Sequence, residues 1–145
     1  EREKDLRPSW GEETGPQGTP AASFANLADP SLLRLCQGER VRPFLPVEAT
    51  DDKHTVSAPA GSYQANPWAL HDLHGNVAEW TLSAGVPYPF RVDASQPPAS
   101  TTRRVVRGGS WYGRADLARS GTRRSHWPWQ RVFDVGFRVV CEAQR

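Results

Sequence analysis

The sequence predicts an α+β fold that is irregular and rich in loops, with few short strands and one or two short helices. The 145 residues include 12 Gly and 13 Pro. Both disfavour long regular elements, because ordering Gly costs entropy and Pro lacks a backbone donor. Six Trp are available to fill several small apolar clusters. Disorder is the alternative that suits the Gly and Pro content, but it does not suit so many aromatic residues.

The first part of the chain predicts one helix between two irregular stretches. Residues 1–23 are polar and contain several Gly and Pro, which predicts a surface arm or loop. Residues 30–36 predict a short helix, because Asp29 suits its N-cap and Pro30 suits its first position. Residues 37–67 show no lasting period and predict an irregular loop.

Strands are predicted in the second part of the chain. Residues 68–80 alternate around a Gly-Asn pair, which predicts a short strand, a tight turn and another short strand. A polar loop is expected over 84–102. Residues 103–111 predict a strand whose glycines let another segment pass close. Residues 135–141 alternate as a half-buried last strand.

The charge is distributed unevenly along the chain. Residues 1–102 carry 8 basic and 13 acidic side chains, whereas residues 103–145 carry 10 Arg and 3 acidic side chains. A basic segment is one mark of a nucleic-acid surface. These Arg alternate with apolar and Gly residues, so we predict structural Arg paired with carboxylates and carbonyls, and no nucleic-acid partner. No membrane partner is expected either, because no apolar run approaches about 20 residues.

The pairing of the two cysteines and the origin of the chain are left open by the sequence. Cys36 and Cys141 suit either one long-range disulfide or two separate thiols. The sequence contains no Met. We therefore expect the chain to be a processed product or a piece of a longer protein. The compartment stays open.

Three segments, in this order, carry a family resemblance: residues 66–80 (NPWALHDLHGNVAEW), 104–111 (RVVRGGSW) and 135–138 (VGFR). Together they resemble the signatures of the formylglycine-generating enzyme (sulfatase-modifying factor) family. The resemblance implies that the loop-rich fold is C-type-lectin-like. It also implies that residues 24–145 are the C-terminal portion of the family domain, with the N-terminal half missing from this chain.

A metal site is predicted at the tight turn. Asp72, Gly75, Val77 and Glu79 alternate around it, so two carboxylates and two backbone carbonyls face one point, and an all-oxygen site suits Ca²⁺. The resemblance implies the same four ligands. The alternative from the residues alone is that Glu79 pairs with an Arg and that Asp72 stabilises the turn.

The resemblance implies a second calcium site, so one or two Ca²⁺ ions are expected. Residues 24–29 (FANLAD) and 52–59 (DKHTVSAP) are similar to the family segments that hold it. Carried over by position, Asn26 and Asp52 would supply side-chain oxygens, and Leu27 and His54 would supply carbonyls. Here Lys53 replaces a Gly and His54 replaces an aromatic residue. A Lys is adverse at a cation site unless it points outward.

Catalysis is not expected from these residues. The family's oxidase binds copper with a Cys pair shortly after its RGGSW strand, and the matching stretch here, residues 112–124, contains no Cys. We therefore expect no copper. His71 and His74 lack a nearby third ligand for zinc, and Ser110 is expected to be a structural serine. An oxidoreductase of the formylglycine-generating or sulfoxide-synthase type, acting on Cys or a thiol, remains the alternative for a longer parent protein.

Residues 112–130 are expected to form the ligand-binding loops, because exposed Trp, Tyr and Arg are enriched at binding hot spots. The candidate residues are Tyr112, Arg114, Asp116, Arg123, Trp127, Trp129 and Gln130. The predicted function is a calcium-stabilised recognition or regulatory module for a protein or small-molecule ligand. The resemblance implies a bacterial parent protein fused to a kinase or caspase-like peptidase. It also implies a partner, either the missing N-terminal half or another chain.

Overall fold

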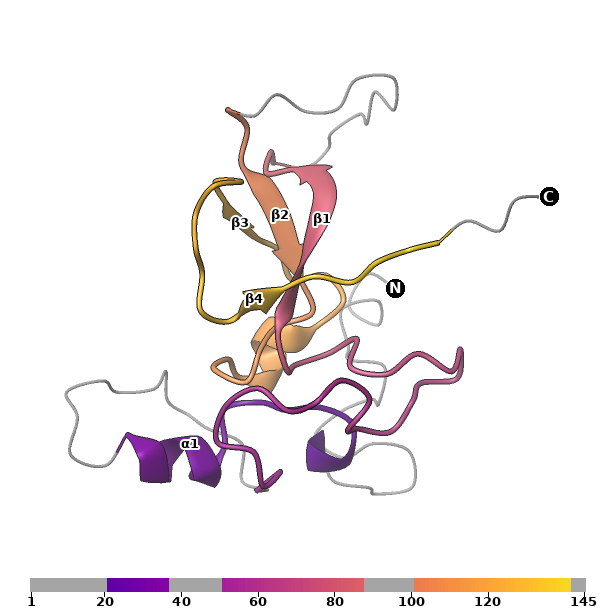
Figure 1. The fold of residues 1–145 in the computed structure, drawn as a ribbon, viewed down its shortest axis with the longest axis vertical. Coiled ribbons are helices and arrows are strands. Elements are labelled where there is room, and N and C mark those ends of the chain that lie inside the picture. The colour runs from indigo at the N-terminus through magenta and orange to yellow at the C-terminus, as the bar shows by residue number, and fades with distance from the viewer. Residues whose placement is uncertain (1–20, 37–50, 88–100, 142–145) are drawn as a thin grey trace.

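A small sheet and one short helix organise the described part of the chain, residues 21–36, 51–87 and 101–141 of the computed structural model. Figure 1 shows the sheet at one end and the helix at the other, with irregular segments between them. This confirms the predicted loop-rich α+β class. Most of the predicted arm 1–23, and parts of the predicted loops 37–67 and 84–102, lie outside the described residues.

The sheet has the strand order β3-β2-β1-β4. Its strands are β1 (Ala78–Ala84), β2 (Arg104–Arg107), β3 (Arg124–His126) and β4 (Val135–Gly136). β2 is antiparallel to β1 and to β3, whereas β4 runs parallel to β1. This order brings the loop that follows β2 close to the segment that precedes β4.

The helix α1 (Pro30–Leu35) forms where the sequence predicts it. Asp29 caps it, because its Oδ1 accepts hydrogen bonds from the backbone N of Ser31 at 2.8 Å and of Leu32 at 3.2 Å. The second oxygen of Asp29 accepts from the backbone N of Asp52 at 2.7 Å. The capping side chain therefore also attaches the helix to a segment 23 residues later.

The strand predicted before the tight turn is not formed, because residues 66–77 make a series of turns. Asn66 Oδ1 accepts from the backbone N of Trp68 at 2.9 Å, which bends the chain. Ala69 and Asp72 have φ values of 58° and 55°, which an extended strand excludes. The alternation of apolar residues in this segment predicted the wrong backbone.

The later strands also differ from the prediction. β2 takes four residues of the predicted strand 103–111, and β4 takes two of the predicted 135–141. Phe137, Val139 and Val140 are 77%, 80% and 88% exposed, so the last segment is not half buried. Figure 1 shows it leaving the sheet. β3 lies in a stretch expected to be loop, and its three residues, Arg-Ser-His, carry no apolar signal.

Buried polar groups hold the loops together beside a small apolar core of Ala25, Leu27 and Ala118, against which Phe24 and Ala115 pack. Asn76 shows the principle. Its backbone N donates to Asn26 O at 2.8 Å, and its carbonyl accepts from Trp111 N at 2.9 Å. Its side chain accepts from Ala58 N at 2.8 Å and donates to Ala58 O at 3.1 Å. One residue thus fastens three distant segments.

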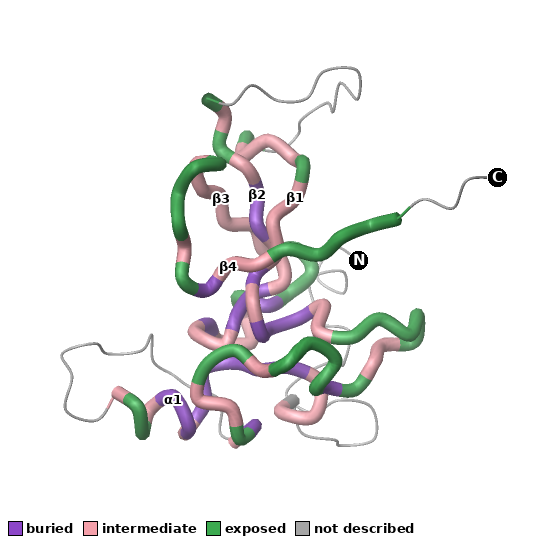
Figure 2. The backbone as a smooth tube through the Cα atoms, viewed as in Figure 1, coloured by how far each residue is buried: buried purple, intermediate pink, exposed green. Residues whose placement is uncertain are grey.

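Many of the buried residues lie in the hydrogen-bonded loops and not in helices or strands. Figure 2 shows buried backbone before and within the start of α1, at the centre of β2, and in the middle of the molecule between sheet and helix. No helix in the described ranges is long and apolar enough to cross a membrane.

Candidate functional site

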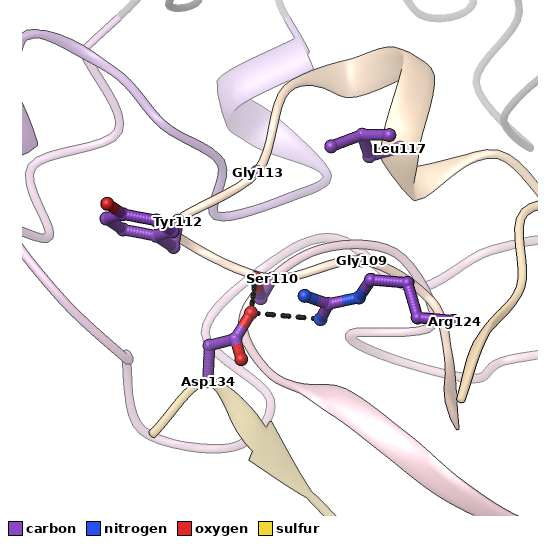
Figure 3. Close-up of a pocket in the computed structure, with 7 residues that line it drawn as sticks. All are labelled: Gly109, Ser110, Tyr112, Gly113, Leu117, Arg124 and Asp134. Carbon is purple, nitrogen blue, oxygen red and sulfur yellow. Dashed lines mark hydrogen bonds and ion pairs between the residues drawn. The ribbon is translucent and has the colours of Figure 1, made fainter. Parts of the chain in front are cut away.

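A pocket of about 290 Å³ opens where the loop after β2 meets the segment before β4. Figure 3 shows its lining: Gly109, Ser110, Tyr112, Gly113, Leu117, Arg124 and Asp134. Most of the wall is apolar, supplied by Tyr112, Leu117 and the glycines. Tyr112 is a predicted ligand contact, whereas Leu117 and Asp134 were missed. Leu117 lies within the loop after β2, in the stretch expected to bind ligand, but it is not one of the Trp, Tyr or Arg residues on which that expectation was based. Asp134 carries no local signal, because only the fold brings it to this loop.

The polar end of the pocket is a three-residue group. Ser110 Oγ donates to Asp134 Oδ2 at 2.7 Å, and Arg124 Nη2 donates to the same oxygen at 2.9 Å (Figure 3). Ser110 and Asp134 are each 2% exposed. The guanidinium balances the buried carboxylate, which would be costly alone. No His or Cys belongs to the described lining, and the carboxylate that accepts the Ser110 proton is itself paired with Arg124. The arrangement suits binding.

Glycine shapes the pocket floor. A Cβ on Gly109 would lie 2.7 Å from Ala118 Cα, and the φ of Gly109 is 73°. The short 3-10 helix η4 (Ala115–Ala118) can therefore approach the end of β2 only because Gly109 lacks a side chain. The predicted close passage of another segment beside these glycines is confirmed.

The structure does not gather the predicted ligand residues into one site. Tyr112 lines the pocket and packs edge-on against Phe133, with ring centroids 5.2 Å apart. Arg114 and Asp116 pair with each other through two hydrogen bonds. These two charged residues are therefore occupied on the surface beside the pocket.

Other arginines of this region serve the fold. Arg123 donates to the carbonyl oxygens of Val86 at 3.1 Å and Ala84 at 3.2 Å. Arg107 donates to Ser120 O at 2.7 Å. These contacts match the predicted structural use of Arg.

Two tryptophans stack on the loop after β3. The ring centroids of Trp127 and Trp129 lie 6.1 Å apart, and the ring planes differ by 5°. The backbone N of Gln130 donates to Trp127 O at 2.9 Å, which closes a turn. Three predicted ligand residues therefore form a second, separate feature.

The residues of the upstream predicted calcium site lie together. Asp52 Oδ2 accepts from Leu27 N at 3.3 Å, and its Oδ1 accepts from His54 N at 2.8 Å. Asn26 Nδ2 donates to Val56 O at 2.8 Å, which fixes the amide. Asn26 Oδ1 is buried and has no hydrogen-bond partner among the described residues. An orphaned amide oxygen in this cluster, which also holds a buried carboxylate, fits a hard cation.

The electrostatics of this cluster also favour a cation. Burial raises the pKa of Asp52 to about 6. The neighbouring Asp29 carboxylate also raises this pKa, whereas the hydrogen bonds that Asp52 accepts from the backbone N–H groups of His54 and Leu27 lower it. Burial, followed by these two carboxylates, raises the pKa of Tyr63. Lys53 is 80% exposed, with Nζ 3.8 Å from Asp51 Oδ2, so it points outward as the predicted site requires. A divalent ion would relieve the burial of these charges.

At the tight turn, Glu79 pairs with an arginine. Arg138 Nε donates to both carboxylate oxygens of Glu79 at 3.0 Å, and its Nη2 donates to Oε1 at 2.6 Å. Nη2 also reaches Asp72 O at 3.3 Å. Asp72 Oδ2 accepts from Gly61 N at 2.5 Å, whereas its Oδ1 is buried without a described partner. The orphaned oxygen fits a cation here, but Glu79 is shared with Arg138. The alternative pairing of Glu79 with an Arg is therefore present.

The other predicted members of the turn site, Gly75 and Val77, lie on the bend between these carboxylates. A Cβ on Gly75 would lie 2.3 Å from Asn26 O, so the turn packs directly on the upstream site. In the described ranges, no three His, Cys, Asp or Glu side chains form a metal cluster. Both predicted calcium sites therefore depend on backbone or amide oxygens.

The histidines and cysteines have ordinary roles. His71 Nδ1 lies 2.7 Å from Tyr63 O, and His74 Nδ1 lies 2.6 Å from Ala118 O. Burial lowers the pKa of His74, which the bond to the carbonyl partly opposes. The two histidines bind different carbonyls, so they do not converge on a metal. No disulfide joins Cys36 to Cys141.

Known proteins share this sequence pattern. A family model described as "Sulfatase-modifying factor enzyme 1-like domain" matches residues 10–143. "Inactive C-alpha-formylglycine-generating enzyme 2" of Mus musculus is 34% identical over 127 residues, 84% of this chain and 37% of that protein. "Serine/threonine-protein kinase pkn1" of Chlamydia pneumoniae is 33% identical over 116 residues, 76% and 18% of the two chains. "Hercynine oxygenase" of Mycobacterium tuberculosis is 30% identical over 148 residues, 92% and 29% of the two.

Solved structures share the fold. PvdO from Pseudomonas aeruginosa superposes with a TM-score of 0.53 and 21% identity, over 82% of this chain and 39% of that chain. CarF superposes with a TM-score of 0.51 and 24% identity, over 88% and 36%. The chain spans less than two fifths of each of these relatives and structures.

Proposed function

Because the chain belongs to the sulfatase-modifying factor enzyme 1-like family, we propose that it is a non-catalytic recognition or regulatory module whose loops are stabilised by calcium. The pocket carries the proposal. Its polar end is neutralised internally by Ser110, Asp134 and Arg124. Residues 112–124, where the family's oxidase holds its copper-binding cysteines, contain no Cys. A site without a redox group or an activated nucleophile is suited to holding a ligand.

The names of two relatives support a non-catalytic or regulatory role. The mouse relative is called inactive, and another relative is a protein kinase of Chlamydia. A non-catalytic role agrees with the name of the mouse relative, and a module within a larger bacterial protein agrees with that of the kinase, whereas hercynine oxygenase is the name of an enzyme. The ligand of the pocket would be a small molecule or one side chain of a protein, because 290 Å³ is at the lower end of known ligand sites. Arg124, whose side chain is 38% exposed, would meet a polar group of that ligand.

Calcium would bind at the upstream cluster. Asn26 and Asp52 would supply side-chain oxygens, and Leu27 and His54 would supply carbonyls. The ion would provide positive charge next to carboxylates that lack it, and would join the segment before α1 to the segment after residue 50. Asp72, Gly75, Val77 and Glu79 form a second proposed position, where calcium would have to compete with Arg138.

A protein partner is also part of the proposal. Leu82, Phe137, Val139 and Val140 are all at least 77% exposed, and exposed apolar surface often marks an interaction site. The N-terminal half of the family domain, or another chain, would cover these side chains.

Thermal unfolding in excess calcium and in excess chelator tests the role of the metal. Calcium is expected to raise Tm, because an ion that binds only the folded state stabilises it. Asp52→Asn removes a charged ligand and should abolish the rise, while Glu79→Gln, measured beside it, reports on the turn site. Equal Tm values with and without calcium would overturn the calcium proposal. Conversion of a Cys-containing sulfatase peptide, with copper and oxygen supplied, would overturn the non-catalytic role.

A further inference from the structure

The side chains at the polar end of the pocket offer a ligand hydrogen-bond donors from one residue. Ser110 Oγ directs its hydrogen to Asp134 Oδ2, so the hydroxyl has no donor left for a ligand. Arg124 binds the same oxygen through Nη2 at 2.9 Å. A guanidinium carries five N–H donors, and no described residue accepts a hydrogen bond from Nε or Nη1 of Arg124. The unused donors of Arg124 therefore call for an acceptor on the ligand.

The rest of the lining selects an apolar ligand body. Tyr112 and Leu117 stand on two sides of the space in Figure 3. The Tyr112 ring is fixed by edge-to-face packing, with centroids 5.6 Å from Trp111 and 5.2 Å from Phe133. The volume of about 290 Å³ admits on the order of ten non-hydrogen atoms. The ligand should therefore be small, with an apolar part between these walls and its acceptor at Arg124.

The charges of the surrounding segment decide between a neutral acceptor and an anion. Residues 103–141 contain nine Arg and two acidic residues, Asp116 and Asp134. Both carboxylates are paired, with Arg114 and with Arg124. No unpaired carboxylate of this segment would therefore repel an anion, whereas the excess of Arg attracts one. An ammonium group in the same place would meet the guanidinium of Arg124.

We infer that the pocket binds a small carboxylate with an apolar aryl or alkyl body. This inference rests on the proposed recognition function and names the ligand class of the same pocket. The carboxylate would accept charge-assisted hydrogen bonds from Arg124, which are stronger than those to a neutral acceptor. Such a group occurs in a free acid and at the C-terminus of a peptide that ends in an apolar residue.

Isothermal titration of the 145-residue chain with matched probes tests the charge and the body. The acids are 3-phenylpropionate and hexanoate, and at least one is expected to bind saturably. The neutral 3-phenylpropionamide should bind roughly tenfold more weakly, because its hydrogen bond to Arg124 is not charge-assisted. The cation 3-phenylpropylamine and the bodiless anion acetate should not bind. The tetrapeptide Gly-Gly-Gly-Phe, compared with its C-terminal amide, distinguishes a peptide end from a free acid as the source.

Three variants test whether the probe lies in this pocket. A Cβ on Gly113 would lie 3.5 Å from Ser110 O and 3.8 Å from Leu117 Cβ, which are ordinary contacts. Gly113→Val should therefore fold, while its methyl groups fill space beside Leu117 and weaken binding at least about tenfold. Arg124→Lys keeps the charge but has fewer donors, and should also weaken binding. Arg131→Gln removes an exposed Arg outside the lining and should leave binding unchanged. Circular dichroism checks that each variant is folded.

The inference is overturned if neither acid binds, if the amide or the amine binds as tightly as the acids, if acetate binds equally well, or if Gly113→Val binds like the parent chain. Its failure is separate from that of the proposed function. Binding of the amide or the amine that Gly113→Val abolishes would leave the pocket a recognition site and remove only the ligand class. Copper-dependent conversion of a sulfatase peptide would remove the proposed function whatever the acids do.

Discussion

Arg138 encloses the carboxylate of Glu79, with three donor contacts of 2.6 to 3.0 Å from its guanidinium. Arg138 follows β4 closely, and Glu79 lies in β1. The same guanidinium also donates to the carbonyl of His71 at 3.0 Å. Since β4 pairs with β1 at only two positions, this side-chain fork is a main attachment of the last segment to the sheet.

Arg138→Gln should therefore reduce the free energy of unfolding by about 1 kcal/mol, the upper range for a partly exposed ion pair with good geometry. The measurement is the urea midpoint at moderate salt. Arg131→Gln is the control, because Arg131 is exposed, and it should leave the midpoint unchanged. Equal midpoints for Arg138→Gln and the parent chain would contradict the structural role of the fork.

Gly109→Ala should destabilise the protein by roughly 3 kcal/mol, since the new Cβ meets Ala118 Cα at 2.7 Å and the backbone is left-handed. Gly61→Ala is the matched control. Its φ is also positive, at 81°, but nothing lies within 4 Å of the new Cβ. It should cost only about 1 kcal/mol for the backbone conformation. If the two variants unfolded at the same urea midpoint, the close packing of η4 on the end of β2 would be wrong.

Asn76→Ala should cost about 3 kcal/mol, because it leaves both backbone groups of Ala58 without their side-chain partner in a part-buried site. Asn also tolerates the positive φ of 59° better than Ala does. Hydrogen exchange provides the readout. The amides of Ala58 and Trp111 are expected to lose protection together, whereas independent behaviour would contradict the shared anchor.

The pair of Arg114 and Asp116 gives a pH dependence of known sign. The hydrogen bond from Arg114 lowers the pKa of Asp116. The folded pKa thus lies below the unfolded value of about 4, so the pair adds stability above that value and loses it as pH falls through the folded pKa. Asp116→Asn should cost about 0.5 kcal/mol at neutral pH, discounted because both side chains are 36% exposed. Unfolding midpoints measured down to acid pH should converge; a constant gap would contradict the ion pair.

Local features of the sequence were sufficient to predict the helix α1 and the fold class. Asp29 and Pro30 act within one helical turn, so their neighbours decide the outcome. The segment before the tight turn was predicted wrongly, because Asn66 offers its side chain to the backbone and Ala69 turns left-handed. A pattern of alternating apolar residues gives no information about a side-chain hydrogen bond to the backbone or about a left-handed residue.

The family resemblance grouped Asn26 and Leu27 with Asp52, and in the structure Leu27 N donates to Asp52 Oδ2. The pocket was not predicted in this way, because its lining comes from segments that no motif connects. Asp134 carries no local signal that it will meet Ser110 across 24 positions. The Glu79 pairing was weighed as an alternative, but the sequence did not identify Arg138 as the partner.

The anchoring at Asn76 has a consequence for how such a scaffold can change. Residues 26, 58 and 111 are all fastened to one position, so the frame is defined by a few contact points and not by the lengths of chain between them. A change in length of a connecting loop that keeps these contacts should therefore be tolerated better than a substitution at position 76 itself.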